Sequence, residues 1–279
     1  GTDENGKKYS IVFDSSGKMT SWTYNGKSLI NAGPDFNSYR KVDNDRNFEP
    51  SFSKSSNLSI KSTLAMSGNN AKMSVNGSAT GCSYTIDYTF YPDGTVDMKV
   101  TFSPSGTLAR IGLGMQFASG FENVEFYARG PRSNYSDRKT GSYLGRFTTT
   151  VDDMVDEMIH PQTFGDHEDM RELILTNKAS NVQIGIKAGG RASFSLSHYD
   201  ETKWCKSGDS MWNTKLHWYD LTRYQQVYAH FDYMQRGLGN NSCGGDGCLS
   251  QYQCPSSGSY TYTLRFKPQS AESVNVVAE

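Results

Sequence analysis

Period-two alternation of apolar and polar residues recurs along the chain and predicts β-strands. The clearest case is the pair of segments 84–90 and 96–102, in which every second residue is apolar. Between them lie Pro92, Asp93 and Gly94, residue types that suit a tight reversal of the backbone. Two alternating segments joined by such a turn predict an antiparallel hairpin.

Similar alternation predicts further strands, and sustained helical periodicity is scarce. The opening segment 9–22 is predicted to form a strand, a turn at Gly17 and a second strand. Strands that each keep one polar face must bury the other face against a second layer. The pattern therefore predicts an all-β fold, a large antiparallel β-sandwich. The other predicted strands are Ile111–Phe117, Val182–Ile186, Phe194–Leu196 and Tyr260–Phe266.

The 279 residues suit either one large all-β unit or two small domains. No shift in composition marks a boundary between domains, so we expect a single sandwich domain over residues 9–270. Residues 1–8 are interpreted as a tag remnant, Gly1, followed by a short polar leader. Residues 271–279 are interpreted as a tail.

Charge and hydropathy narrow the classes of partner. The chain has 28 basic and 29 acidic residues, so no strong field favours nucleic acid or an anionic membrane. No apolar run reaches the roughly 20 residues that cross a bilayer, and no signal segment opens the chain. We therefore expect a soluble chain with no nucleic-acid or membrane partner. The compartment stays open, an exported or periplasmic parent protein being one alternative.

The five cysteines leave the redox state open. They do not show the paired C-x-x-C spacing of a structural zinc site. A loop disulfide within the last three is one alternative, and free thiols are the other. The five are Cys82, Cys205, Cys243, Cys248 and Cys254.

Several stretches, read in order, resemble the small-chain domain of family 2 β-galactosidases. The strongest is Gly130-Pro-Arg-Ser-Asn-Tyr-Ser-Asp-Arg138, which is close to the family's "G-P-x-E-N-Y-P-D-R". The resemblance covers nearly the whole chain. The other stretches that carry it are Phe13–Ile30, Phe36–Asp45, Met158–Gly165, Ser195–Tyr199 and Gln235–Gly239.

This resemblance implies a galactose-mutarotase-like supersandwich at the end of a multidomain glycosidase. In that family both catalytic carboxylates come from a (β/α)8 barrel, which needs about 250 residues of alternating strands and helices. The present sequence holds no such pattern. We therefore expect no catalytic residue and no cofactor in this chain, and no hydrolysis by the chain alone. The implied partners are the catalytic barrel and a β-galactoside or galactose.

The resemblance also selects residues that could face a sugar or the active site. At position 243 the best-known members carry a tryptophan that stacks on the leaving group, whereas this chain has cysteine. Thr163-Phe164 replaces the family's Glu-Asn, and Ser133 replaces a glutamate. The candidate residues are Asp43, Asn44, Asn134, Tyr135, Asp137, Arg138, His160, Gln162 and Cys243.

Alternatives remain for these groups. The polar side chains of residues 134–138 can tie down their own loop instead of a sugar. The acidic clusters 152–157 and 166–169 are expected to be solvated loops. No recognised ligand spacing links the second cluster to His160, so we expect no metal. Two other functions stay open, a non-catalytic carbohydrate-binding module and an aldose mutarotase, although a shared fold does not establish activity.

Overall fold

The computed structural model describes residues 1–42, 57–204, 216–239 and 247–271. Within these ranges the chain forms sixteen β-strands and four short 3-10 helices. The helices are η2 (Asp152–Met154), η3 (Glu201–Lys203), η4 (Trp218–Asp220) and η5 (Ser250–Tyr252). The strands are β1 (Tyr9–Phe13), β2 (Met19–Tyr24), β3 (Lys27–Ser28), β4 (Ile30–Asn37), β5 (Asn57–Ser67), β6 (Asn70–Ala79), β7 (Cys82–Phe90), β8 (Val96–Pro104), β9 (Arg110–Phe117), β10 (Asn123–Gly130), β11 (Tyr143–Thr150), β12 (Glu172–Asn177), β13 (Val182–Gly189), β14 (Ser193–Ser197), β15 (Val227–Gln235) and β16 (Tyr260–Ser270).

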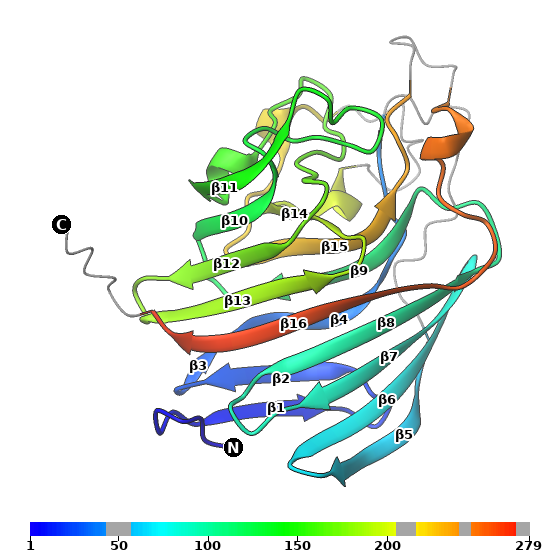
Figure 1. The fold of residues 1–279 in the computed structure, drawn as a ribbon. Coiled ribbons are helices and arrows are strands. Elements are labelled where there is room, and N and C mark those ends of the chain that lie inside the picture. The colour runs from blue at the N-terminus through cyan, green and yellow to red at the C-terminus, as the bar shows by residue number, and fades with distance from the viewer. Residues whose placement is uncertain (43–56, 205–215, 240–246, 272–279) are drawn as a thin grey trace.

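The strands form three antiparallel sheets in two layers. One layer is a nine-stranded sheet in the order β11-β10-β12-β13-β16-β8-β7-β6-β5. The other layer consists of a four-stranded sheet, β14-β15-β9-β4, and a three-stranded sheet, β1-β2-β3. Figure 1 shows the large sheet in front of the two smaller ones. The predicted all-β, antiparallel sandwich is confirmed.

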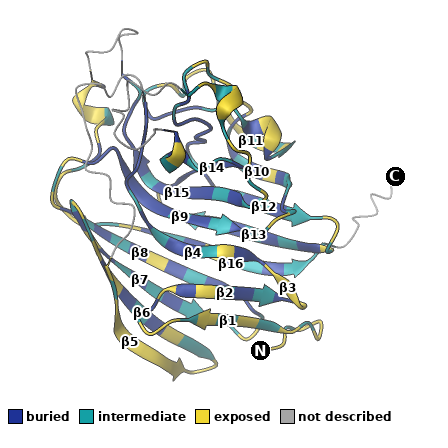
Figure 2. Ribbon diagram, turned by 180° about the vertical axis from the view of Figure 1, so that it is seen from behind, coloured by how far each residue is buried: buried dark blue, intermediate teal, exposed yellow. Residues whose placement is uncertain are grey.

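The core lies between these layers and is built from the inward residues of each alternating strand. Aromatic rings join the layers: Trp22 of β2 lies 6.0 Å from Phe266 of β16, and Phe36 of β4 lies 6.1 Å from Phe102 of β8, measured between ring centroids. Figure 2 shows the alternation of buried and more exposed positions along the strands. Burial of so many apolar side chains is the main stabilising term of the fold.

The predicted hairpin is confirmed as β7 and β8. Tyr88 pairs with Met98, and Phe90 pairs with Val96. The turn between them closes with a hydrogen bond of 2.9 Å from the Tyr91 amide to the Thr95 carbonyl. Its Gly94 has φ of +83°, a conformation that favours glycine.

The described strands begin at Tyr9 and end at Ser270, and the assignment of residues 9–270 to a single domain stays a prediction. None of the helices found in the described ranges is long and apolar enough to cross a membrane.

Candidate functional site

The loop that follows β10 holds the segment that follows β15. The carboxylate of Asp137 accepts hydrogen bonds from the backbone amides of Leu238 and Gly239, at 3.0 and 2.9 Å. Arg138 donates a hydrogen bond of 2.6 Å to the Gly239 carbonyl. These charge-assisted contacts fix residues 238–239 against the loop. In Figure 1 the chain beyond β10 (green) and beyond β15 (orange) lies at the top of the view.

Two more segments join the same place. The buried guanidinium of Arg40 donates to the carbonyls of Arg236 and Gly237. The segment around Thr163 is tied to Lys41 through its backbone amide, which donates to the Lys41 carbonyl at 2.5 Å. The Thr163 hydroxyl accepts from the Lys41 amide at 2.9 Å. We call the meeting point of segments 36–42, 130–141, 158–170 and 235–239 the loop cluster.

Asn134 is a buried link inside the loop cluster. Its side-chain amide donates to the carbonyls of Arg129 and Arg132, each at 3.1 Å, and its oxygen accepts from the Glu168 amide at 3.0 Å. Only 1% of the residue is exposed. All of these partners are backbone groups of the chain itself, so Asn134 orders two loops.

The other predicted site residues have different positions. Tyr135 is buried, and this burial together with the nearby Asp166 carboxyl raises the pKa of its hydroxyl. His160 and Gln162 are half-buried on the stretch that leads to Thr163. Their contact with a sugar stays a prediction, as it does for residues 134–138. Asp43, Asn44 and Cys243 lie outside the described residues.

A buried charge network underlies the loop cluster. Arg110 Nε lies 2.8 Å from Asp232 Oδ2, and Arg110 Nη1 lies 3.6 Å from Glu201 Oε2. Burial alone would raise the pKa of Glu201, but the Arg110 charge and the hydrogen bonds from His230 and Thr163 outweigh it and lower that pKa to about 2. Burial raises the pKa of Asp232 to about 6 despite Arg110. The sequence motifs pointed to none of these residues, because their charge partners lie on elements far apart in the sequence, β9, β15 and η3.

The two acidic clusters differ from each other. Asp152 and Asp153 are exposed, as predicted for a solvated loop. The prediction is wrong for Asp166, His167 and Glu168, which are 0%, 2% and 3% exposed. An antiparallel bridge between His167 and Phe194 draws this stretch against β14. Burial then lowers the pKa of His167, which favours its neutral form.

One further group brings metal-ligating atoms together. Single ligand atoms of Glu122, Asp152 and His198 lie within 4.8 Å of one another. However, the Arg223 guanidinium makes two hydrogen bonds of 2.9 Å to the Asp152 carboxylate. This guanidinium already pairs with Asp152, and it also lies 3.8 Å from the Glu122 carboxylate.

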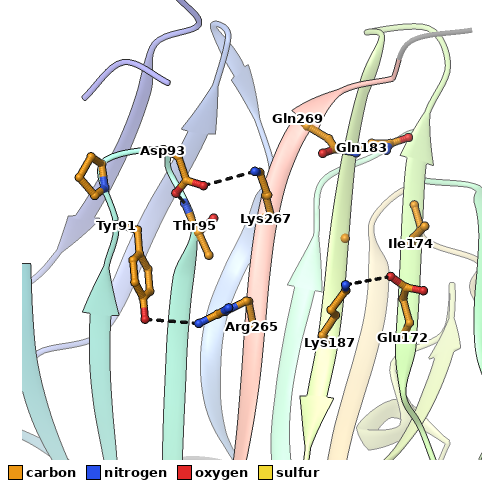
Figure 3. A pocket seen from close by; sticks show the side chains of 12 residues that line it. Tyr91, Asp93, Thr95, Glu172, Ile174, Gln183, Lys187, Arg265, Lys267 and Gln269 are labelled. Carbon is orange, nitrogen blue, oxygen red and sulfur yellow. Dashed lines mark hydrogen bonds and ion pairs between the residues drawn. The ribbon is translucent and has the colours of Figure 1, made fainter. Parts of the chain in front are cut away.

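A cavity of about 600 Å³ lies on the solvent face of the nine-stranded sheet, away from the loop cluster. Figure 3 shows its charged side chains paired among themselves, with Lys267 facing Asp93 and Lys187 facing Glu172. Arg265, in the same cavity, contacts Asp97 through two hydrogen bonds. None of the predicted site residues that the structure describes lines it.

A second cavity of about 300 Å³ borders the charge network on the outer face of the four-stranded sheet. His230 lies at its base, where Nδ1 is 3.2 Å from Asn37 Nδ2 and Nε2 is 3.4 Å from Glu201 Oε1. Because an amide nitrogen can only donate, Nδ1 accepts and Nε2 carries the proton toward Glu201. The imidazole is thereby held in one orientation.

Cys82, Cys248 and Cys254 are buried free thiols. The disulfide considered for the C-terminal cysteines therefore does not join Cys248 to Cys254. Cys205 and Cys243 lie outside the described residues.

Residues 5–266 match the family model described as "Beta galactosidase small chain". A β-galactosidase of Staphylococcus xylosus is 32% identical over 148 residues, which cover 53% of this chain and 13% of the relative. A β-galactosidase of Priestia megaterium is 28% identical over 207 residues, which cover 71% of this chain and 18% of the relative. The chain thus spans less than a fifth of the length of these two relatives.

Among solved structures, a galactose mutarotase-like protein from Lactobacillus casei is similar, with a TM-score of 0.50 and 12% identity. The match covers 96% of this chain and 99% of that protein. At this identity the likeness shows the fold alone, and it confirms the predicted mutarotase-like supersandwich.

Proposed function

This chain belongs to the β-galactosidase small-chain family, and from that premise we propose that it is a non-catalytic part of a β-galactosidase, lining the entrance of an active site whose carboxylates lie elsewhere. In this proposal the chain packs against a catalytic (β/α)8 barrel in the full-length enzyme. Its loop cluster influences which β-galactoside leaving group fits.

The single observation that carries the proposal is the convergence of four family-like segments in the loop cluster. The contacts of Arg40, Asp137 and Arg138 all fix the backbone of residues 236–239. A loop held by charged groups on both sides is preorganised, and preorganised loops position a substrate at low entropic cost. Residue 243, where the best-known family members place their stacking tryptophan, follows this loop by four positions.

The first test is hydrolysis of a chromogenic aryl β-galactoside. We expect no turnover by the 279-residue chain and turnover by the full-length enzyme that contains it. Hydrolysis by purified chain alone, surviving repeated chromatography, would overturn the assignment of the chemistry to another domain.

The second test addresses the role of the loop cluster. In the full-length enzyme, Asp137→Ala frees residues 238–239, so we expect kcat/KM to fall by about tenfold or more, unequally among aryl galactosides with different leaving groups. Arg265→Ala, on the opposite sheet, is the matched control and should leave these values unchanged. Equal loss for every leaving group would contradict a role in leaving-group fit.

Two other readings predict different results for the isolated chain. Calorimetric titration with galactose and lactose would show binding if the chain were a carbohydrate-binding module. Polarimetry on fresh α-galactose would show accelerated mutarotation if it were a mutarotase. We expect neither sugar binding nor mutarotation by the isolated chain, because in our proposal the active-site entrance is complete only when the barrel forms its other side.

A further inference from the structure

Buried polar atoms without hydrogen bonds are concentrated in one place. Among the described residues, ten buried side-chain nitrogen and oxygen atoms have no well-aligned hydrogen bond, and nine of them belong to five residues in or beside the charge network. Native proteins leave few such atoms, because each costs about 1–3 kcal/mol. A concentration of this kind marks a place where several buried polar groups could together bind one ligand. The five residues are Arg110, Asp166, Ser193, Asp232 and Gln235.

Strand register places four of these side chains on one face of the four-stranded sheet. Asp232 of β15 lies opposite Ser193 of β14, and Gln235 lies opposite Arg110 of β9. Residues directly opposite in an antiparallel pair point to the same side. Asp232 also lies opposite Gly112, where an added Cβ would lie only 2.1 Å from Asp232 Oδ1. The Asp232 carboxylate therefore lies over β9, on the side of Arg110.

Asp166 faces the same cluster from the segment that pairs with β14. Its neighbour His167 pairs with Phe194, so Asp166 points to the side opposite to them, the side of Ser193. Asp166 is fully buried, and its pKa is raised well above the usual range by burial and by the Glu168 and Asp232 charges. Neither carboxyl oxygen has a well-aligned hydrogen bond from the described residues, although the nearby Ser193 hydroxyl acts to lower the pKa of Asp166.

The charges of this cluster would not balance if all of its carboxyl groups were ionised. Asp166, Asp232 and Glu201 face one guanidinium, that of Arg110. Glu201 has further support, because Thr163 donates to it at 2.9 Å and His230 lies 3.4 Å away. Asp166 has weaker support, because burial outweighs the Arg110 charge and the Ser193 hydroxyl, which act to lower its pKa. A buried, unpaired carboxylate is costly by several kcal/mol unless it is protonated or a cation joins it.

We propose that this cluster is a binding site for one hard cation, Na⁺ or Ca²⁺, held by the side-chain oxygens of Asp166, Ser193, Asp232 and Gln235. The donors are two carboxylates, a hydroxyl and an amide carbonyl, the oxygen ligands that hard cations prefer. Mg²⁺ suits the site less well, because it usually keeps several waters and demands near-ideal octahedral geometry.

Other occupants fit the cluster less well. Three carboxyl groups beside one guanidinium disfavour an anion. The unpaired atoms are sealed from solvent, which leaves no entry for a sugar. Arg110 Nε lies 2.8 Å from Asp232 Oδ2, so the two groups form an ion pair, but they are not aligned for a hydrogen bond. Asp232 Oδ1 and both Asp166 oxygens remain for a cation.

The cation would act on the loop cluster. Gln235 directly precedes the Arg236 and Gly237 carbonyls that Arg40 holds, and the Asp166 carbonyl accepts the Asn134 amide at 2.7 Å. Binding would therefore fix two of the four segments from below.

The test uses the 279-residue chain, dialysed into a buffer whose only cations are bulky organic ones. We expect CaCl2 or NaCl to raise Tm by about 5 °C at concentrations near a hundred times Kd, and choline chloride at matched ionic strength to have no effect. Native mass spectrometry or elemental analysis should find one cation per chain. A chain that gains neither mass nor stability with either salt would overturn the proposal.

Two variants localise the effect. Asp166→Asn keeps the shape and removes the charge, so the Tm response should disappear. Ser193→Ala is a milder change that should weaken cation binding by about tenfold, and it serves if Asp166→Asn does not fold. Asp152→Asn alters the Glu122–Asp152–His198 group instead and should leave the response intact. The proposal fails if the response is lost with Asp152→Asn, or if Asp166→Asn and Ser193→Ala both respond like wild type.

Discussion

Asp137 lies so close to Gly237 that a Cβ added to the glycine would be 2.6 Å from the Asp137 carboxyl carbon. The absence of a side chain at position 237 is what lets the carboxylate reach the two amides beyond it. The first glycine of the family-like Gly-Leu-Gly stretch, Gly237, is therefore required for a steric reason. The side chain of Asp137, 100 positions earlier, occupies the space that a Cβ would need.

Gly237→Ala should destabilise the chain by about 1–3 kcal/mol, because either the Asp137 carboxylate or the loop must move. Urea unfolding followed by circular dichroism measures the change. Gly141→Ala is the matched control, since an added Cβ there meets nothing within 4 Å. Equal stability of the Gly237→Ala and Gly141→Ala variants would contradict this prediction, because it would mean that the loop accommodates the added Cβ with no loss of stability.

Removing Arg110 should lower the free energy of unfolding far more than removing a similarly paired surface arginine. Arg110→Ala leaves Asp232 and Glu201 buried without their cation, for an expected loss of about 3–5 kcal/mol. Arg265→Ala breaks an ion pair with Asp97 that is half-exposed on the arginine side, for an expected loss of about 1 kcal/mol or less. Denaturant titration of both variants checks the contrast, and losses of similar size would contradict it.

Glu201 should make the chain sensitive to acid. Its pKa falls from an ordinary 4.5 to about 2 in the folded state. A lowered carboxyl pKa contributes stability that is complete above pH 4.5 and is lost as the pH falls toward 2, about 3 kcal/mol in all. Urea midpoints measured across this range should fall less steeply for Glu201→Gln than for wild type. The exposed variant Asp153→Asn should keep the wild-type slope, and a Glu201→Gln slope equal to it would refute this role.

Cys82 and Cys254 should resist alkylation in the folded chain. Burial raises the pKa of Cys82 to about 11 and that of Cys254 to about 12, which removes the reactive thiolate near neutral pH. Iodoacetamide labelling resolved by peptide mass spectrometry should leave both unmodified until urea is added. Rapid labelling of Cys254 in the native chain would mean that its surroundings open readily.

The strands were predictable because alternation is a local signal. The hairpin of β7 and β8 needs only nearby apolar residues and a turn at Gly94, all within about twenty positions. The family-like stretches could likewise be recognised from the order of their residues. The role of Asp137 as a clamp on residues 238–239 was not predictable, although its binding to its own neighbours was one alternative.

The buried charges were not predictable, because burial of a polar stretch depends on distant partners. Residues 166–168 have the composition of a solvated loop, and only their pairing with β14 removes them from water. Arg110 and Asp232 are each single charged residues in otherwise alternating strands. Only the register between β9 and β15 makes them a pair.

The guanidinium of Arg40 is held by a carbonyl 196 positions later in the chain. During synthesis, Arg40 emerges from the ribosome long before its partner exists, and the hairpins between them can close first because their contacts are local. The loop cluster should thus be among the last parts of the molecule to form. Chains truncated before Arg236 would lack both the closed loop cluster and β16, the strand that joins β13 to β8 in the nine-stranded sheet.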